Sequence, residues 1–118
     1  MKVVEIKKHG GPEVLYIGSR PVPKPKKNEV LIKVKAAGVN RPDILQREGD
    51  YPPPKDESDI LGLEVSGEVV ELGEKTKNIK IGDKVCALVS GGGYSEYCLA
   101  PYTQCLPIPK NINFEEAS

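Results

Sequence analysis

The side chains that could do chemistry by themselves are few and scattered in this chain. Its single histidine, His9, precedes Gly10, Gly11 and Pro12, and this setting is typical of an exposed turn. Asp83 follows a glycine in a similar turn pattern. The sequence contains no nucleophile paired with a base and no triad of metal-binding residues. We therefore expect no complete catalytic constellation within these 118 residues.

Two further features could suggest chemistry but favour a structural interpretation. Cys86, Cys98 and Cys105 lack C-x-x-C spacing and lie in apolar runs, so we expect buried, reduced thiols, with catalysis or metal binding as the alternative. The glycine run 91–93 resembles a phosphate loop. An alternating strand pattern follows it, however, and not the helix whose N-terminus would hold a phosphate. We expect a hairpin or a bulged loop at this run.

The overall composition excludes several classes of partner. A chain of 118 residues with 38% hydrophobic residues suits one compact domain with a modest core. The 17 Lys and Arg residues balance the 17 Asp and Glu residues, so no basic field would attract nucleic acid or an anionic membrane. The apolar runs are too short for a signal peptide or a transmembrane helix. We therefore expect a cytoplasmic protein with no nucleic-acid or membrane partner.

Short segments of alternating apolar and polar residues predict a mainly β fold. The 11 prolines and 12 glycines divide the chain into these segments. The expected strands are 3–6 and 14–17, which form an opening hairpin, then 29–39, 64–72, 84–89, 94–100 and 104–108. Several short strands favour a closed or partly open barrel, because closure removes exposed edges.

One short internal helix is expected after the third strand. Asn40 is a good N-cap, and Pro42 is tolerated in the first turn. Asp43 complements the positive end of the helix dipole. Gly49 can end the helix in the left-handed conformation.

A second helix signal lies at the end of the chain. Asn113 followed by Glu116 is a capping-box pattern, and the sequence stops at Ser118, within about one turn of the helix start. So short a helix has little stability in isolation. We therefore expect residues 1–118 to be one domain that was cut from a longer chain or is completed by a second polypeptide.

Two segments taken together resemble the catalytic-domain motifs of the medium-chain dehydrogenase/reductase superfamily. They are residues 36–43 (AAGVNRPD) and residues 62–73 (GLEVSGEVVELG). The resemblance covers the whole chain and includes GGPE at 10–13, IGDKV at 81–85 and GYSEY at 93–97. It implies an N-terminal GroES-like substrate domain, a partly open β-barrel with one short internal helix. The Rossmann cofactor domain that follows it in the family is absent from this chain.

The sequence departs from the zinc-dependent branch of that superfamily. Zinc alcohol dehydrogenases have a cysteine where this chain has Asn40 and a histidine where it has Leu63. They also carry a lobe with four structural zinc cysteines, which is absent here. Zinc prefers thiolate, imidazole and carboxylate ligands, so we expect no metal. Residues 40–47 (NRPDILQR) and 49–51 (GDY) instead resemble the zinc-free quinone oxidoreductases, most closely the p53-inducible type.

The resemblance to quinone oxidoreductases implies an activity and a set of site residues. That family uses NADPH, bound mainly by the missing domain, to reduce quinones and related conjugated carbonyls. The resemblance places Asn40 and Tyr51 at the cleft as catalytic residues, with Asn40 also binding cofactor and Tyr51 and Asp43 binding substrate. A quinone oxygen gains negative charge as hydride arrives, and a phenol or an amide can stabilise that charge. As structural alternatives, Asn40 caps its helix, Asp43 complements the dipole, and Tyr51 is a packed loop aromatic.

The expected protein is the substrate-side domain of an NADPH-dependent quinone or enone oxidoreductase. We expect the 118 residues to be inactive alone and the full-length protein to form a homodimer. One alternative is an enoyl-thioester reductase of the same superfamily. Another is a stand-alone GroES-like binding or assembly module, or a regulator without a partner domain, because the fold by itself does not determine the function.

Overall fold

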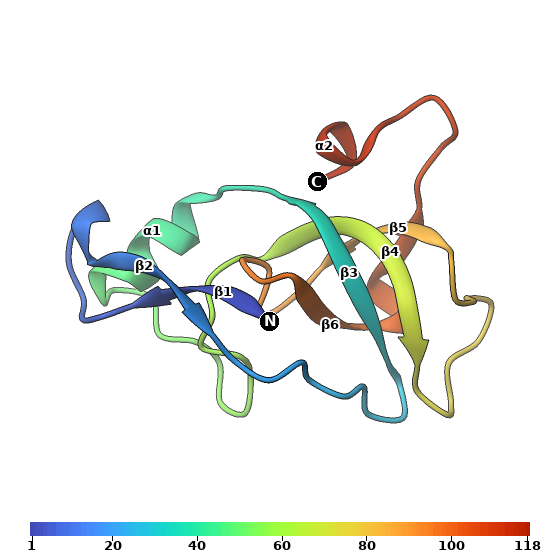
Figure 1. Cartoon of the computed structure of the whole chain (residues 1–118), viewed down its shortest axis with the longest axis horizontal. Coiled ribbons are helices and arrows are strands. Elements are labelled where there is room, and N and C mark those ends of the chain that lie inside the picture. The colour runs from blue at the N-terminus through green and yellow to red at the C-terminus, as the bar shows by residue number, and fades with distance from the viewer.

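The computed structural model describes residues 1–118 and shows two antiparallel β-sheets with a short helix beside them (Figure 1). The smaller sheet is a hairpin of β1 (Lys2–Ile6) and β2 (Leu15–Ser19). The larger sheet has the strand order β6-β3-β4-β5-β7. Its strands are β3 (Glu29–Ala37), β4 (Glu64–Leu72), β5 (Lys84–Leu88), β6 (Tyr97–Pro101) and β7 (Cys105–Pro107). The helices are α1 (Arg41–Glu48) and α2 (Phe114–Ala117), and 3₁₀ turns cover Pro12–Val14 and Tyr102–Gln104.

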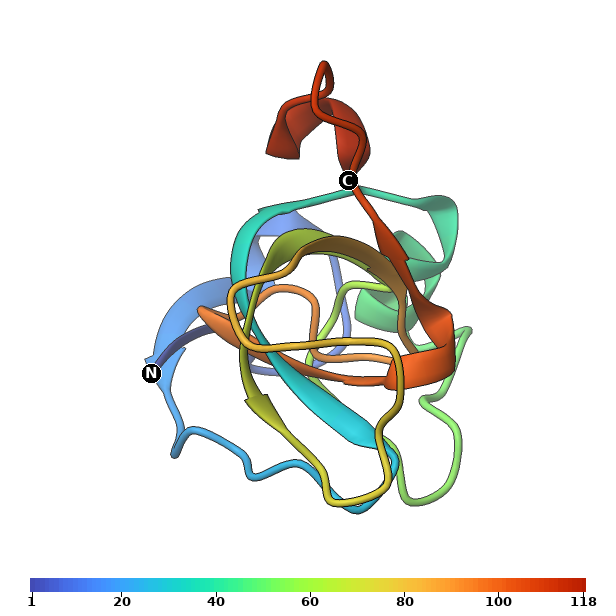
Figure 2. The same ribbon diagram turned by 90° about the vertical axis from the view of Figure 1, so that its right-hand side faces the viewer.

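The core is built from inward-facing residues of the larger sheet. Val30, Ile32, Val65, Val69 and Ala100 are each 0% exposed. Those that share a strand lie two or four positions apart, as one face of a pleated strand requires. Figure 2 shows how strongly the sheet curves around this core. The alternation that predicts the strands thus reflects the burial of one face.

The larger sheet is not closed into a barrel. Its edge strands are β6 and β7, and no pairing joins them although they are neighbours along the chain. The chain turns through Tyr102–Gln104, and the three-residue β7 pairs with β5. Pro101 and Pro107 at the strand ends have no N–H with which to extend a ladder. A mainly β, partly open barrel with one internal helix is confirmed, whereas a closed barrel is wrong.

The strand predicted at 94–100 begins later than expected, at Tyr97. The Ser95 hydroxyl lies within hydrogen-bond distance of the carbonyl oxygens of Gly92 and Tyr97. Residues 94–96 pair instead with β1, since the Val4 N–H donates to the Tyr94 carbonyl oxygen at 2.9 Å and the Glu96 N–H donates to the Lys2 carbonyl oxygen at 3.1 Å. The glycine run 91–93 belongs to the same loop and leads into a strand, which agrees with the bulged-loop alternative.

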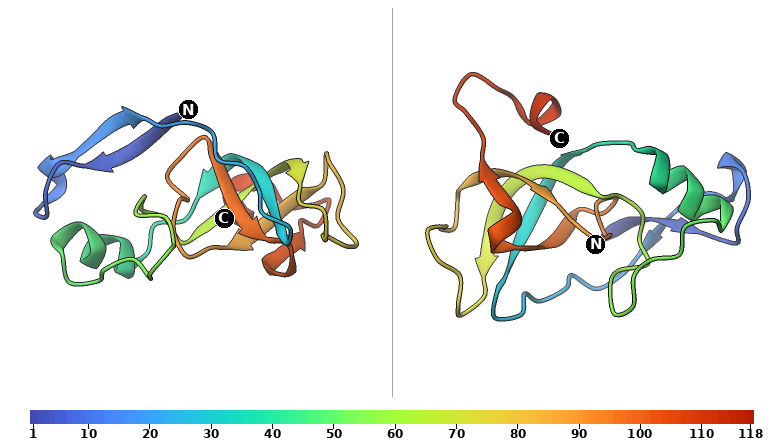
Figure 3. Two further views of the ribbon diagram at one scale, coloured as in Figure 1. Left: turned by 90° about the horizontal axis from the view of Figure 1, so that it is seen from below. Right: turned by 180° about the vertical axis from the view of Figure 1, so that it is seen from behind.

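The hairpin and α1 occupy the same end of the molecule (Figure 3). The Gly10 N–H donates to the Arg47 carbonyl oxygen, and Arg47 Nε donates to the Gly10 carbonyl oxygen, both at 3.0 Å. A bridge between Val3 and Ser95 joins the hairpin to the chain before β6. These contacts hold the hairpin against both the helix and the larger sheet.

Both predicted helices are present. Asn40 is the N-cap of α1, and Gly49 ends it with φ of 98°. In α2, Asn113 accepts a hydrogen bond from the Glu116 N–H at 2.8 Å, and Ser66 Oγ on β4 donates to the carbonyl oxygen of Phe114. No helix is long and apolar enough to cross a lipid bilayer.

Candidate functional site

Asn40 stands at the junction of β3 and α1. Its backbone is extended, with φ of −124° and ψ of 159°, and its N–H donates to Asp43 Oδ2 at 2.9 Å. Its side-chain Nδ2 donates to Glu64 Oε1 at 3.0 Å. Asn40 therefore starts the helix and also directs its side-chain amide toward β4.

Glu64 is a residue of this region that the sequence alone does not single out. It is the first residue of β4, and its carbonyl oxygen accepts from the Gly38 N–H at 3.2 Å. A Cβ atom at position 38 would collide with the Glu64 carboxylate, so glycine there leaves the room that this side chain occupies. The sequence feature that could have pointed to Glu64 is its position directly after Leu63, where the motif departs from zinc-dependent relatives.

Asp43 is a buried carboxylate, only 3% exposed. Its Oδ1 accepts from the Gly62 N–H at 3.1 Å, and its Oδ2 accepts from the Asn40 N–H at 2.9 Å and the Tyr94 hydroxyl at 2.8 Å. Burial raises the pKa of Tyr94, and the hydrogen bond to Asp43 raises it further, so the phenol remains a donor. Asp43 thus joins α1 to the turn before β4 and to the loop before β6.

Gly62 is held in a conformation that favours glycine, with φ of 101°. A Cβ atom there would lie 2.7 Å from Gly93 Cα and from the Tyr94 backbone nitrogen. We expect Gly62→Ala to lower the free energy of unfolding by about 3 kcal/mol, measured by urea titration. Gly82→Ala is the matched control, because Gly82 has φ of 92° but a Cβ atom there would have no neighbour within 4 Å. Equal losses in the two variants would contradict a role for the close approach to Gly93.

Tyr51 lies just beyond α1 and is 42% exposed. It borders a cavity of about 490 Å³ between α1, the loop that follows it and the hairpin. This volume falls within the range of small-molecule sites. The lining residues are Val4, Glu5, Ile6, Lys8, His9, Gln46, Gly49, Tyr51, Pro52, Pro53 and Asp59.

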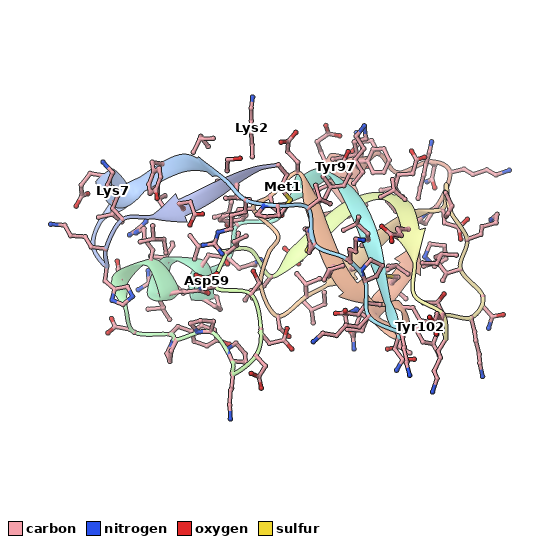
Figure 4. The ribbon with its side chains drawn as sticks, turned by 60° about the horizontal axis from the view of Figure 1, so that its bottom comes forward. Met1, Lys2, Lys7, Asp59, Tyr97 and Tyr102 are labelled. Atoms are coloured by element: carbon pink, nitrogen blue, oxygen red, sulfur yellow. The ribbon has the colours of Figure 1, made fainter.

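The two carboxylates of this cavity share one arginine. Arg20 binds Glu5 through Nε and Asp59 through a terminal nitrogen, both at 2.6 Å. These hydrogen bonds from Arg20 lower the pKa of both carboxyl groups. Figure 4 shows Asp59 between α1 and the hairpin. Arg20 offsets much of their negative charge.

Residues 26–110 match the family described as the alcohol dehydrogenase GroES-like domain. The chain belongs to this family. Its resemblance to the quinone oxidoreductases of the medium-chain dehydrogenase/reductase superfamily is also confirmed, because relatives with that name match over the whole chain.

Three relatives illustrate this similarity. A quinone oxidoreductase from Mus musculus is 36% identical over 120 residues, which cover 100% of this chain and 36% of the relative. The crystal structure of Escherichia coli quinone oxidoreductase complexed with NADPH superposes with a TM-score of 0.90 at 36% identity, covering 99% of this chain and 36% of that one. A trans-enoyl reductase from Aspergillus flavipes is 36% identical over 92% of this chain and 34% of its own length. The chain thus spans about a third of the relatives it matches.

Asn40 does not line the cavity of the GroES-like domain that Tyr51 borders. They flank α1 at opposite ends, and a helix of eight residues rises about 12 Å. The Asn40 amide is bound to Glu64 on β4, whereas Tyr51 borders the cavity beside the hairpin. The predicted residues therefore form two groups, one at each end of the helix.

This GroES-like domain has Asn40 and Leu63 at the positions expected for zinc ligands in zinc-dependent relatives. The Asn40 amide is already bound to Glu64, and Leu63 offers an isobutyl group. An amide and an alkyl group are poor zinc ligands. No group of three or more His, Cys, Asp or Glu side chains is placed to hold a metal ion.

The cysteines and the histidine of the GroES-like domain are the remaining residues that could react. Cys98 is buried, and burial raises the pKa of its thiol to about 12, so the reactive thiolate is disfavoured. Cys86 and Cys105 are only half-buried, so the expectation of three buried thiols was correct for Cys98 alone. His9 is exposed, as predicted, and lies against Gly49.

Proposed function

We propose that this chain is the substrate-side domain of an NADPH-dependent oxidoreductase that reduces quinones or other conjugated carbonyls. The observation that carries the proposal is the Asn40–Glu64 hydrogen bond at the position where zinc-dependent relatives bind their metal. Similarity to quinone oxidoreductases over the whole chain supports it, as does the NADPH complex of the Escherichia coli relative. In this proposal a Rossmann domain beyond the 118 residues binds most of the cofactor.

The residues at the β3–α1 junction fit a nicotinamide ring. Asn40 Nδ2 carries two hydrogens and Glu64 accepts one of them, which leaves a donor for a ligand. Val39 beside it is 78% exposed and offers apolar surface to a ring. When bound, NADPH supplies the hydride. Asn40 orients the ring. Asp43 is 3% exposed and its oxygens accept from three protein donors, so in this proposal it holds the Asn40 backbone and does not bind the substrate itself.

Tyr51 is the proposed donor to the acceptor. Tyr51 lines a cavity of about 490 Å³. A phenol that donates to a carbonyl oxygen stabilises the negative charge that develops there. The reaction uses no zinc in this proposal, because Asn40 and Leu63 stand where zinc-dependent relatives have a cysteine and a histidine ligand. Homodimer formation and a cytoplasmic location remain predictions.

The isolated domain provides the first test. We expect residues 1–118 alone to oxidise no NADPH, because the domain lacks most of the proposed cofactor site. The full-length protein should oxidise NADPH when a quinone is added, which the loss of NADPH absorbance measures. Quinone-dependent turnover by the 118 residues alone would contradict the proposed division of the site.

An enoyl reductase is the second candidate, favoured by the trans-enoyl reductase that is 36% identical to this chain. Parallel assays of the full-length protein with a quinone and with an enoyl thioester separate the two candidates. Turnover of the thioester without turnover of the quinone would replace the first proposal by the second.

A further inference from the structure

Two carboxylates from different elements hold Asn40. Asp43 on α1 accepts from its backbone N–H at 2.9 Å. Glu64 on β4 accepts from its side-chain Nδ2 at 3.0 Å. An ionised carboxylate accepts hydrogen bonds and donates none. The backbone and the side chain of Asn40 are therefore restrained separately.

Glu64 determines which way round the Asn40 amide lies. With the amide reversed, its oxygen would face a carboxylate, which has no hydrogen to donate and carries like charge. The observed orientation instead turns the NH₂ group toward Glu64. One hydrogen of that group is then used, and the other has a defined direction.

Glu64 is itself held in place. Its backbone pairs with Leu88 on β5 and accepts from the Gly38 N–H at 3.2 Å. Its side chain crosses the space that a Cβ atom on Gly38 would fill. Both ends of the Asn40–Glu64 hydrogen bond therefore rest on the larger sheet and the helix that follows β3.

We propose that Glu64 is the positioning residue of the proposed reaction, holding the Asn40 amide with its free N–H directed to the bound nicotinamide ring. This role rests on the proposed function. Glu64 acts through Asn40 and does not touch the reacting atoms. Its loss allows the amide to rotate, and misplaced orienting groups lower turnover more than they weaken binding.

Two substitutions in the full-length protein separate the carboxylate from the side-chain volume. Glu64→Met keeps an unbranched stem over Gly38 but removes the acceptor, and Glu64→Gln keeps an acceptor oxygen for Asn40. We expect Glu64→Met to lower kcat for quinone reduction about tenfold, with KM for quinone changed by less than about twofold. Glu64→Gln should recover only part of that loss, because its oxygen still accepts from the Asn40 NH₂ group while its own NH₂ group also permits the reversed amide. A Glu64→Met variant with unchanged kcat would overturn the proposal.

A double-mutant cycle with Asn40→Ala tests whether Glu64 acts through Asn40. We expect Glu64→Met to cause no further loss of kcat once the Asn40 side chain is absent. An equal fold-loss in the presence and absence of that side chain would overturn the proposal, because Glu64 would then act independently.

A spectroscopic readout keeps this test separate from the proposed activity. If the full-length protein reduces no quinone, the proposed function fails, whereas the Asn40–Glu64 pairing is still measured by the Asn40 side-chain signals in a proton–nitrogen correlation spectrum. We expect Glu64→Met to shift these signals and Glu64→Gln to leave them closer to the wild-type position. Signals that stay in place in Glu64→Met would overturn the positioning role.

Discussion

Replacing Tyr51 by phenylalanine in the full-length protein is expected to lower kcat for quinone reduction about 100-fold, as the loss of a preorganised donor to a developing oxyanion does. The ring stays in place and only the hydroxyl is lost. That hydroxyl has no partner within the chain and the residue is 42% exposed, so the free energy of unfolding should change by less than about 0.5 kcal/mol. Steady-state kinetics and a urea titration measure the two quantities.

Tyr16→Phe is the matched control for Tyr51→Phe. Tyr16 on β2 is 43% exposed and does not line the cavity that contains Tyr51. Removing its hydroxyl should leave kcat and the free energy of unfolding unchanged. Unaltered quinone reduction by Tyr51→Phe would remove Tyr51 from the mechanism. A loss of the same size in Tyr16→Phe would show that the effect is not specific to the cavity.

The largest stability effect is expected for Asp43→Ala, which should lower the free energy of unfolding by about 4 kcal/mol. The substitution leaves three donors without their acceptor: the N–H groups of Asn40 and Gly62 and the hydroxyl of Tyr94. Asp43 is 3% exposed, so water cannot readily take over these hydrogen bonds. A urea titration followed by circular dichroism measures the loss.

Tyr94→Phe provides the comparison for Asp43→Ala, because it removes one of the three hydrogen bonds and keeps the carboxylate. We expect it to cost about 1.5 kcal/mol. An Asp43→Ala loss no larger than that of Tyr94→Phe would contradict the role of Asp43 as the acceptor that joins three segments.

Local signals in the sequence predicted most of the secondary structure. Strand β4 has the predicted bounds, 64–72, because alternation along a half-buried strand is a property of consecutive residues. Helix α1 lies between its predicted cap at Asn40 and its predicted end at Gly49 for the same reason. The later start of β6 was not predicted, because residues 94–96 pair with β1, which is distant in the sequence.

The sequence by itself determined the family and the residue types of the site. The ordered motifs at 36–43 and 62–73, with Asn40 and Leu63 in place of zinc ligands, indicated a zinc-free quinone oxidoreductase. The match to the GroES-like domain family and to quinone oxidoreductases agrees with the family, whereas the absence of zinc stays a prediction. Residue identity carries this information directly, because an alkyl side chain cannot bind zinc in any conformation.

Only the tertiary structure decided which of these side chains meet. Asn40 and Glu64 are 24 residues apart in the sequence, and Asp43 and Tyr94 are 51 apart, yet each pair is hydrogen-bonded. Asn40 and Tyr51 lie before and after α1, and only Tyr51 lines the cavity beside the hairpin. Periodicity and capping describe neighbours along the chain, whereas contacts between strands depend on pairing and on where glycines such as Gly38 leave room.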